Sequence, residues 1–206
     1  MTIKLSEGGK RFNREWIFRK ANLEFTSGIS YAITGPNGSG KSTLLQAIGG
    51  MLQLSEGSIT FLDVDGNFLE TPYRHLSFCA PYLDVIEEMT LLEFLAFHQQ
   101  FKQPLPGITA TDVIRTIGLE ASAEKQIRYY SSGMKQRVKL AQAILIDTPV
   151  LLLDEPCTNL DETGIRLYHS LIDTYCKDRL VVVCSNDAVE YRFCKQRIAI
   201  TDYKPG

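Results

Sequence analysis

Four residues near the start of the chain, Gly35, Gly40, Lys41 and Ser42, have the spacing G-x-x-x-x-G-K-[ST]. Glycines let backbone N–H groups approach a phosphate without an intervening Cβ, and the helix start behind them adds unpaired donors and partial positive charge. Lys41 would reach the β- and γ-phosphates of a triphosphate, and the Ser42 hydroxyl would bind Mg²⁺. A glycine-rich turn with a surface lysine is the disfavoured alternative. We expect the binding residues to be Asn37, Gly38, Ser39, Gly40, Lys41, Ser42 and Thr43.

A second candidate group follows an apolar run in the segment VLLLDEP. Residues 150–153 predict a buried strand that ends in Asp154 and Glu155, and open α/β sheets bind ligands at the carboxyl ends of their strands. Asp154 would support the Mg²⁺ shell, and Glu155 would be the general base for an attacking water. Taken alone, the same residues are also a common turn signal.

The segment YSSGMKQR has two interpretations. Ser131 and Ser132, followed by Gly133, are typical of a helix N-cap. A helix start of this kind is also an anion receptor, and the chain then has two such receptors for one nucleotide. The residues alone leave both interpretations open.

The elements around these motifs alternate between buried strands and helices. Apolar, β-branched runs predict short strands, and the Thr90/Glu93 pair has the spacing of a capping box at a helix start. The chain from about 84 to 146 is mostly helical, so we expect a helical lobe that interrupts an α/β core with a largely parallel sheet. The expected strands cover 29–34, 58–61, 76–79, 150–153, 180–184 and 197–201, and the helix behind the glycines covers 41–48.

Composition limits the function classes. A net charge of −2 over 206 residues argues against a protein whose main work is to hold nucleic acid or an anionic membrane. The five cysteines are odd in number and show no CxxC spacing, which favours reduced thiols in the cytoplasm. No run approaches 18 apolar residues, so we expect the chain to reach a membrane only through a partner.

Together these segments resemble the nucleotide-binding domain, or ATPase subunit, of the ABC transporter family. GPNGSGKST resembles the Walker A loop, VLLLDEP the Walker B strand, and YSSGMKQR a variant of the LSGGQ signature. The segment TNLD, which ends at Asp161, resembles the D-loop. Phe12 lies where the family usually has the aromatic residue that stacks on adenine, although a phenylalanine near an N-terminus is often simply a core residue. The match extends in order over essentially the whole chain.

The resemblance implies a fold and a mode of action. It implies one P-loop NTPase domain over residues 1–206, with a mostly parallel sheet, an antiparallel N-terminal β portion and a helical subdomain inserted at about 84–146. ATP and Mg²⁺ are the implied ligands. Two such domains pair head to tail, as a homodimer or with a similar domain, so that Ser131 and Gly133 of one close on the γ-phosphate held by Lys41 of the other. A separate membrane-spanning subunit would place the pair on the inner face of the membrane.

Two positions depart from the family pattern. Pro81 stands where the glutamine of the Q-loop is usual, and Tyr82 and Asp84 are nearby candidates to replace it. Asn186 stands in place of the switch histidine, and losing a well-aimed donor in such a site typically costs about 10²- to 10³-fold in rate. We therefore expect slow hydrolysis with intact binding. The alternative for Asn186 is that it only starts the next helix together with Asp187.

The sequence alone leaves other functions possible. One is an ABC ATPase without a membrane partner, for example of the iron–sulfur assembly type. Another is a switch that closes on ATP and hardly turns over, which the residues at 81 and 186 suggest. A small-molecule kinase is disfavoured because Glu155 directly follows Asp154 and because the Ser-Ser-Gly helix start would have no role.

Overall fold

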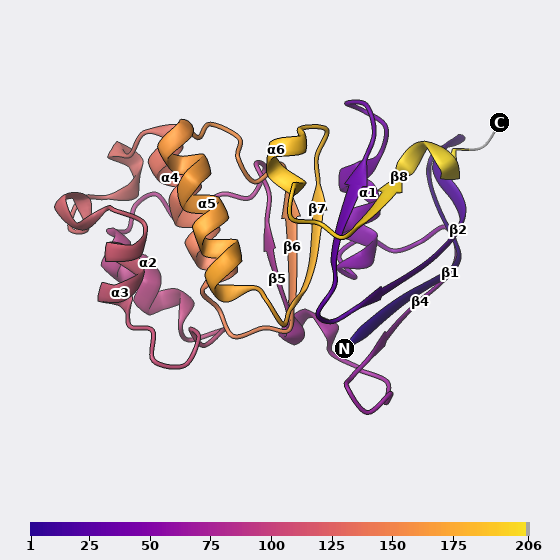
Figure 1. The fold of residues 1–206 in the computed structure, drawn as a ribbon, viewed down its shortest axis with the longest axis horizontal. Coiled ribbons are helices and arrows are strands. Elements are labelled where there is room, and N and C mark those ends of the chain that lie inside the picture. The colour runs from indigo at the N-terminus through magenta and orange to yellow at the C-terminus, as the bar shows by residue number, and fades with distance from the viewer. Residues whose placement is uncertain (205–206) are drawn as a thin grey trace. The chain divides into compact units, whose positions relative to one another are not determined.

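The computed structural model describes residues 1–204, and these divide into two compact units (Figure 1). The first unit consists of Met1–Phe78, Thr148–Asp154 and the described residues from Asp178 onward. The second consists of Cys79–Asp147 and Glu155–Lys177. The last two residues of the expected domain, 205 and 206, lie outside the described residues.

The first unit contains a three-stranded antiparallel sheet with the order β2-β1-β4. Its strands are β1 (Thr2–Phe12), β2 (Glu15–Thr26) and β4 (Glu56–Leu62). The pairing of β1 with β2 shifts register between Leu5 and Gly8 and again on either side of Lys10, as expected for β-bulges. This sheet confirms the antiparallel N-terminal β portion.

The same unit contains a five-stranded sheet with the order β5-β6-β7-β3-β8, and the pairs β6/β7, β7/β3 and β3/β8 are parallel. This sheet confirms the predicted α/β core. Its strands are β3 (Ser30–Thr34), β5 (Leu76–Cys79), β6 (Val150–Asp154), β7 (Leu180–Cys184) and β8 (Gln196–Ala199).

Helix α1 (Lys41–Ile48) joins the two sheets of the first unit, because it contacts β1 of the antiparallel sheet and both β6 and β7 of the parallel sheet. Its apolar residues Leu44, Leu45 and Ile48 are fully buried in one core with residues of both sheets. The polar loop before this helix is thereby fixed to a rigid support. The unit also contains the short helix α6 (Ala188–Tyr191) and 3-10 turns at Pro72–His75 and Ile200–Tyr203.

The second unit is helical. The predicted capping box at the start of α2 is confirmed, since Thr90 accepts from the Glu93 amide and Glu93 accepts from the Thr90 amide. Helix α4 packs against α5, and α2 packs against α3. Among residues 1–204, no helix is both long enough and apolar enough to cross a lipid bilayer. The helices are α2 (Leu91–His98), α3 (Ala110–Thr116), α4 (Ser132–Ile144) and α5 (Glu162–Tyr175), with 3-10 turns at Glu120–Ser122 and Ile127–Tyr129.

All five cysteines lie within the described residues and are free thiols. Cys79, Cys176 and Cys184 are buried, whereas Cys157 and Cys194 are partly exposed. Burial raises the pKa of the Cys194 thiol to about 12, so this thiol stays protonated at neutral pH.

Candidate functional site

The loop between β3 and α1 depends on glycine conformations. Gly35, Gly38 and Gly40 all have positive φ, with values of 151°, 75° and 100°. At Gly40 a second constraint acts, because a Cβ atom there would collide with the Cγ2 methyl of Ile17 in β2. The loop therefore packs closely against β2, and residue 40 must be glycine for both reasons.

The polar side chains of this loop are largely enclosed. Lys41 is only 5% exposed, and its Nζ donates to the carbonyl oxygens of Gly35 and Pro36 at 2.9 and 3.2 Å. Ser39 is 7% exposed, and within residues 1–204 its hydroxyl has no hydrogen-bond partner. Ser42 and Thr43 are partly buried in the first turn of α1. The ammonium group thus lies against the loop that was predicted to hold phosphate, and the same loop contains a buried hydroxyl with which a ligand oxygen could form a hydrogen bond.

Three neighbouring strands end at the same edge of the parallel sheet. Asp154, at the end of β6, pairs with Cys184 at the end of β7, which in turn pairs with Ile33 of β3. The sheet therefore brings Asp154, which is only 2% exposed, to the edge from which residues 35–40 start. This is the edge where open α/β sheets bind ligands. We call residues 35–40, the loop between β3 and α1, the phosphate loop after its predicted ligand.

Asn186 follows β7 and reaches the phosphate loop. Its Nδ2 donates to Oδ1 of Asn37 at 3.0 Å. The cap of helix α6 is Asp187, whose carboxylate accepts from the Val189 amide at 2.9 Å. Capping thus belongs to Asp187, and the amide of Asn186 is directed to the loop.

Phe12 lies at the end of β1 and is not a core residue. Its side chain is 48% exposed, which leaves an aromatic surface open to solvent. The Lys10 ammonium lies 5.1 Å from the centre of the Phe12 ring. An exposed ring of this kind can stack on a planar ligand.

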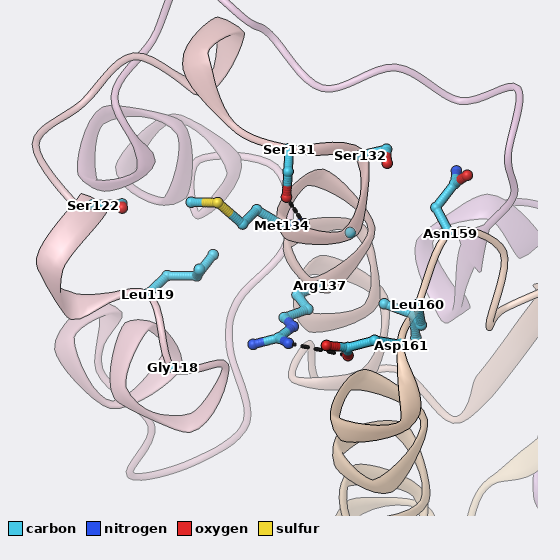
Figure 2. A pocket seen from close by; sticks show the side chains of 11 residues that line it. Gly118, Leu119, Ser122, Ser131, Ser132, Met134, Arg137, Asn159, Leu160 and Asp161 are labelled. Carbon is cyan, nitrogen blue, oxygen red and sulfur yellow. Dashed lines mark hydrogen bonds and ion pairs between the residues drawn. The ribbon is translucent and has the colours of Figure 1, made fainter.

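In the second unit, the start of α4 borders a cavity of about 480 Å³ (Figure 2). Ser131 is the N-cap of α4, and its hydroxyl accepts from the Met134 amide at 3.2 Å. A Cβ atom at Gly133 would lie 3.0 Å from the carbonyl oxygen of Asn159, so the helix start and the loop before α5 are in close contact. The cavity is lined by Gly118, Leu119, Ser122, Ser131, Ser132, Gly133, Met134, Arg137, Asn159, Leu160 and Asp161.

Asp161 caps α5 and forms an ion pair on the wall of this cavity. Its carboxylate accepts from the Gly164 amide at 2.7 Å, and Arg137 Nη2 lies 3.5 Å from the same oxygen (Figure 2). The backbone bond from Gly164 and, to a smaller extent, the charge of Arg137 lower the pKa of Asp161. The carboxylate is therefore ionised at neutral pH, with a cation beside it.

Glu155 has a strained backbone. Its φ is 43°, in the left-handed region that residues other than glycine rarely adopt. Its carbonyl oxygen accepts from the Thr158 amide at 3.1 Å and from the Thr158 hydroxyl at 2.9 Å, which holds this turn in place. Such strain persists only where surrounding bonds impose it, and it clusters at functional sites.

Comparison with known proteins agrees with this geometry. The family model described as "ABC transporter" matches residues 18–158, which include the phosphate loop, the α4 start and the strand that ends at Asp154. The chain belongs to the ABC transporter family.

Curated relatives of this ABC transporter chain are named as ATP-binding proteins. It is 32% identical over 87% of its length to the ABC transporter ATP-binding protein YhcH of Bacillus subtilis, and 31% identical over 88% to the cytochrome c biogenesis ATP-binding export protein CcmA of Rhizobium meliloti. It covers 89% of the length of CcmA and 60% of the length of YhcH. It covers about half of the length of the sulfate/thiosulfate import ATP-binding proteins CysA of Nephroselmis olivacea and Nitrosomonas europaea, at 48% and 46%.

A solved structure shows the same fold. The ABC transporter cassette MJ0796, solved as a dimer, superposes with a TM-score of 0.79 at 26% identity and covers 96% of this chain and 93% of its own. The P-loop NTPase fold predicted from the sequence is confirmed by this agreement.

Helix α4 of this ABC transporter chain contacts the segment that contains Pro81. Lys139 Nζ donates to the Pro81 carbonyl oxygen at 3.0 Å, and Lys135 forms an ion pair with Glu87. Gln136, between them, donates to the Pro156 carbonyl oxygen at 2.7 Å. One helix thereby fastens the loop before α2 and the turn after Glu155.

Sequence reasoning missed several residues of the cavity in this ABC transporter chain. Arg137 lies four residues after Gly133 on α4, so helical spacing gave a weak signal that the two residues face the same side. Gly118 and Leu119 had no signal, because only the folded second unit brings the segment after α3 to the start of α4.

Proposed function

We propose that this chain is the ATP-binding and ATP-hydrolysing part of an ABC transporter, and that it dimerises around two ATP molecules to drive a separate membrane-spanning subunit. The observation that carries the proposal is the phosphate loop at the carboxyl edge of the parallel sheet, with Lys41 bonded to its carbonyls and Asp154 at the end of β6, two strands from β3. The domain would extend over residues 1–206, with a helical subdomain inserted at about 84–146.

The phosphate loop would bind the triphosphate of ATP. Backbone amides of Asn37, Gly38, Ser39 and Gly40 would donate to phosphate oxygens, since glycine at 38 leaves open space beside the backbone. The side chain of Lys41 would leave the loop carbonyls and bind the β- and γ-phosphates. Thr43 and the amides of the first turn of α1 would add donors at the helix N-terminus.

The residues at this edge fit a magnesium ion. Hard oxygen ligands are what Mg²⁺ prefers, and the Ser42 hydroxyl and the buried Asp154 carboxylate supply them in the first unit. When bound, Mg²⁺ would neutralise charge that develops on the phosphate oxygens.

Glu155 would act as the general base in hydrolysis. A water proton would pass to its carboxylate while the water oxygen bonds to the γ-phosphorus, and the bond from that phosphorus to the ADP oxygen would break. The strained φ of 43° supports a role that needs a fixed orientation. Asn186 would donate an amide hydrogen toward the γ-phosphate from its position beside Asn37.

The α4 start would bind the nucleotide held by a second copy or a similar domain. Ser131 and Gly133 lie at the N-terminus of a 13-residue helix, where backbone amides and the helix dipole favour anions. Asp161 lies on the wall of the same cavity. The dimeric structure of MJ0796 supports pairing of such cassettes.

The membrane-spanning partner is proposed from the relatives. CcmA is named as an ATP-binding export protein, and other relatives are named as import ATP-binding proteins. A cassette of this kind would lie on the cytoplasmic face of the membrane, held there by its partner subunit.

Phosphate release by the purified chain tests the proposal, with Glu155→Gln beside it. Removing a general base typically costs about 10²-fold or more in rate, so Glu155→Gln should be inactive while wild type releases phosphate. Glu162→Gln is the matched control, because Glu162 is an exposed residue of the first turn of α5. Equal rates for wild type and Glu155→Gln would contradict the assigned base, and absence of ATP binding would contradict the function itself.

We further propose that hydrolysis is slow because Pro81 and Asn186 replace the usual glutamine and histidine. Asn186→His should then raise the turnover number, by up to about 10²-fold if a charged donor restores the missing contact. Asn186→Gln is the control that keeps a neutral amide. A wild-type rate that neither substitution changes would contradict this explanation.

A further inference from the structure

The ring of Phe12 has a fixed cation beside it. Lys10 Nζ lies 5.1 Å from the ring centre, within the range of a cation–π interaction. The same ammonium donates to the carbonyl oxygen of Gln53 at 2.9 Å. The lysine ammonium therefore has two contacts, one with the Phe12 ring and one with the Gln53 carbonyl oxygen.

The strand end that carries Phe12 is also held. The hydroxyl of Ser55 accepts from the Arg11 amide at 3.1 Å and donates to the Arg11 carbonyl oxygen at 3.4 Å. The amide of Ser55 donates to the Gly9 carbonyl oxygen at 2.8 Å. Residues 53–55 thus fix the backbone on which both Lys10 and Phe12 stand.

This strand end is linked to the phosphate loop. Phe12 pairs with Glu15 across the β1–β2 turn, and Ile17, two residues further along β2, touches the Gly40 backbone closely enough to exclude a Cβ atom. A ligand in the phosphate loop therefore has the β1–β2 turn beside it.

We propose that Lys10 is a positioning residue for the base of the bound nucleotide, a role that rests on the proposed ATP-binding function. It attaches to the Phe12 ring and to Gln53, and the 48% exposed ring offers its remaining surface to a purine base. A fixed ring loses less conformational freedom on stacking than a free one, so the cation strengthens base binding without touching the base.

The test compares Lys10→Met with wild type for two ligands, Mg-ATP and Mg-tripolyphosphate, by titration calorimetry of the full chain. We expect ATP affinity to fall about two- to five-fold, the size of an exposed cation–π contact, and tripolyphosphate affinity to stay unchanged. Arg11→Met is the matched control: it removes the same charge from the same end of β1, but the Arg11 guanidinium lies over the Trp16 ring at 5.5 Å.

Two further variants distinguish the positioning of the Phe12 ring by Lys10 from a general effect of its positive charge on ATP binding. Lys10→Arg keeps a cation and should retain most of the ATP affinity. In a Phe12→Leu background, Lys10→Met should have no further effect, because the ring it positions is gone. Equal losses for ATP and tripolyphosphate, or additive effects of the two substitutions, would overturn the assignment. A wild-type chain that binds neither ligand would overturn the proposed function, and the Lys10 assignment with it.

Discussion

The phosphate loop of the first unit and the α4 start of the second unit are both helix N-termini, yet they differ in how their polar groups are satisfied. Lys41 is 5% exposed and bonds to carbonyls of its own loop. Ser131 and Ser132 are exposed and border a cavity of about 480 Å³. Under the proposed function, the loop binds its ligand without help from a second molecule, whereas the α4 start binds a ligand that a second molecule holds. Substitutions in the first region should change affinity, and those in the second should change assembly.

The largest expected effect belongs to Lys41→Ala. Each hydrogen bond to a charged group contributes about 1.5–3 kcal/mol, so losing the contacts to two phosphates should weaken ATP binding by about 100-fold or more. Calorimetry on the isolated chain measures this, and Ser131→Ala should leave the same affinity unchanged. Because Lys41 also bonds to Gly35 and Pro36, a thermal melt must confirm that the variant is folded. Unchanged affinity would remove the proposed role of the loop.

Gly133→Asp should change dimerisation and not ATP affinity, the opposite of what we expect for Lys41→Ala. The new carboxylate would stand at the α4 start and repel phosphate, so ATP-dependent dimerisation should be lost while ATP affinity of the monomer stays as in wild type. Light scattering of the Glu155→Gln chain with Mg-ATP, with and without Gly133→Asp, measures the dimer.

A mixture of two inactive variants tests directly whether two copies of this chain pair head to tail. Gly133→Asp and Lys41→Ala, each inactive alone, should together recover part of the hydrolysis, because a head-to-tail pair then contains one site with both parts intact. No recovery, with both variants folded, would contradict pairing between two copies of this chain.

A smaller effect is expected where α4 fastens the neighbouring loop. Lys139→Met removes the bond to the Pro81 carbonyl oxygen, a contact of about 0.5–1.5 kcal/mol. The amides of Ile127 and Arg128, which donate to the carbonyls of Met89 and Glu87, should exchange about two- to ten-fold faster with solvent. ATP affinity should not change. Lys125→Met, on the same unit, serves as a control, and unchanged exchange in Lys139→Met would show that the bond does not hold the loop.

The smallest expected effect is a change in the stability of the fold at acid pH, which depends on the ionisation of Asp161. The pKa of Asp161 is lowered in the fold by the Gly164 amide and then by Arg137, so the ionised form stabilises the fold above the unfolded pKa. This contribution is lost as pH falls through the folded pKa, below the ordinary value of 3.8. Asp161→Asn keeps the cap but removes the charge. Its melting temperature should be slightly lower than that of wild type at pH 6, and the difference should shrink as the pH falls below 3.8.

Local chemistry explains which parts of the molecule were predictable. The capping box at Thr90 and Glu93 and the N-cap at Ser131 depend on neighbours three residues away, and both are present. The same reasoning overlooked the second box, at Thr109 and Asp112, because aspartate is a less usual partner than glutamate.

Long-range features were less accessible. The bounds of β1 and β2 escaped a simple alternation pattern because the bulges beside Gly8 and Lys10 shift the register and mix polar and apolar residues on each side. The link between Ile17 and Gly40 joins segments that are 23 positions apart, and the Arg137–Asp161 pair joins two helices. No short motif encodes such contacts, since they depend on how the folded elements pack.

The five cysteines differ in exposure, and this difference should allow selective labelling of the turn after β6. Three of the five are buried, and the pKa of about 12 keeps Cys194 protonated and therefore slow toward alkylating reagents. Cys157, partly exposed and two residues beyond Glu155, is the native position that a thiol-directed dye should label first. A fluorophore attached there would report movement of this turn during turnover without any engineered cysteine.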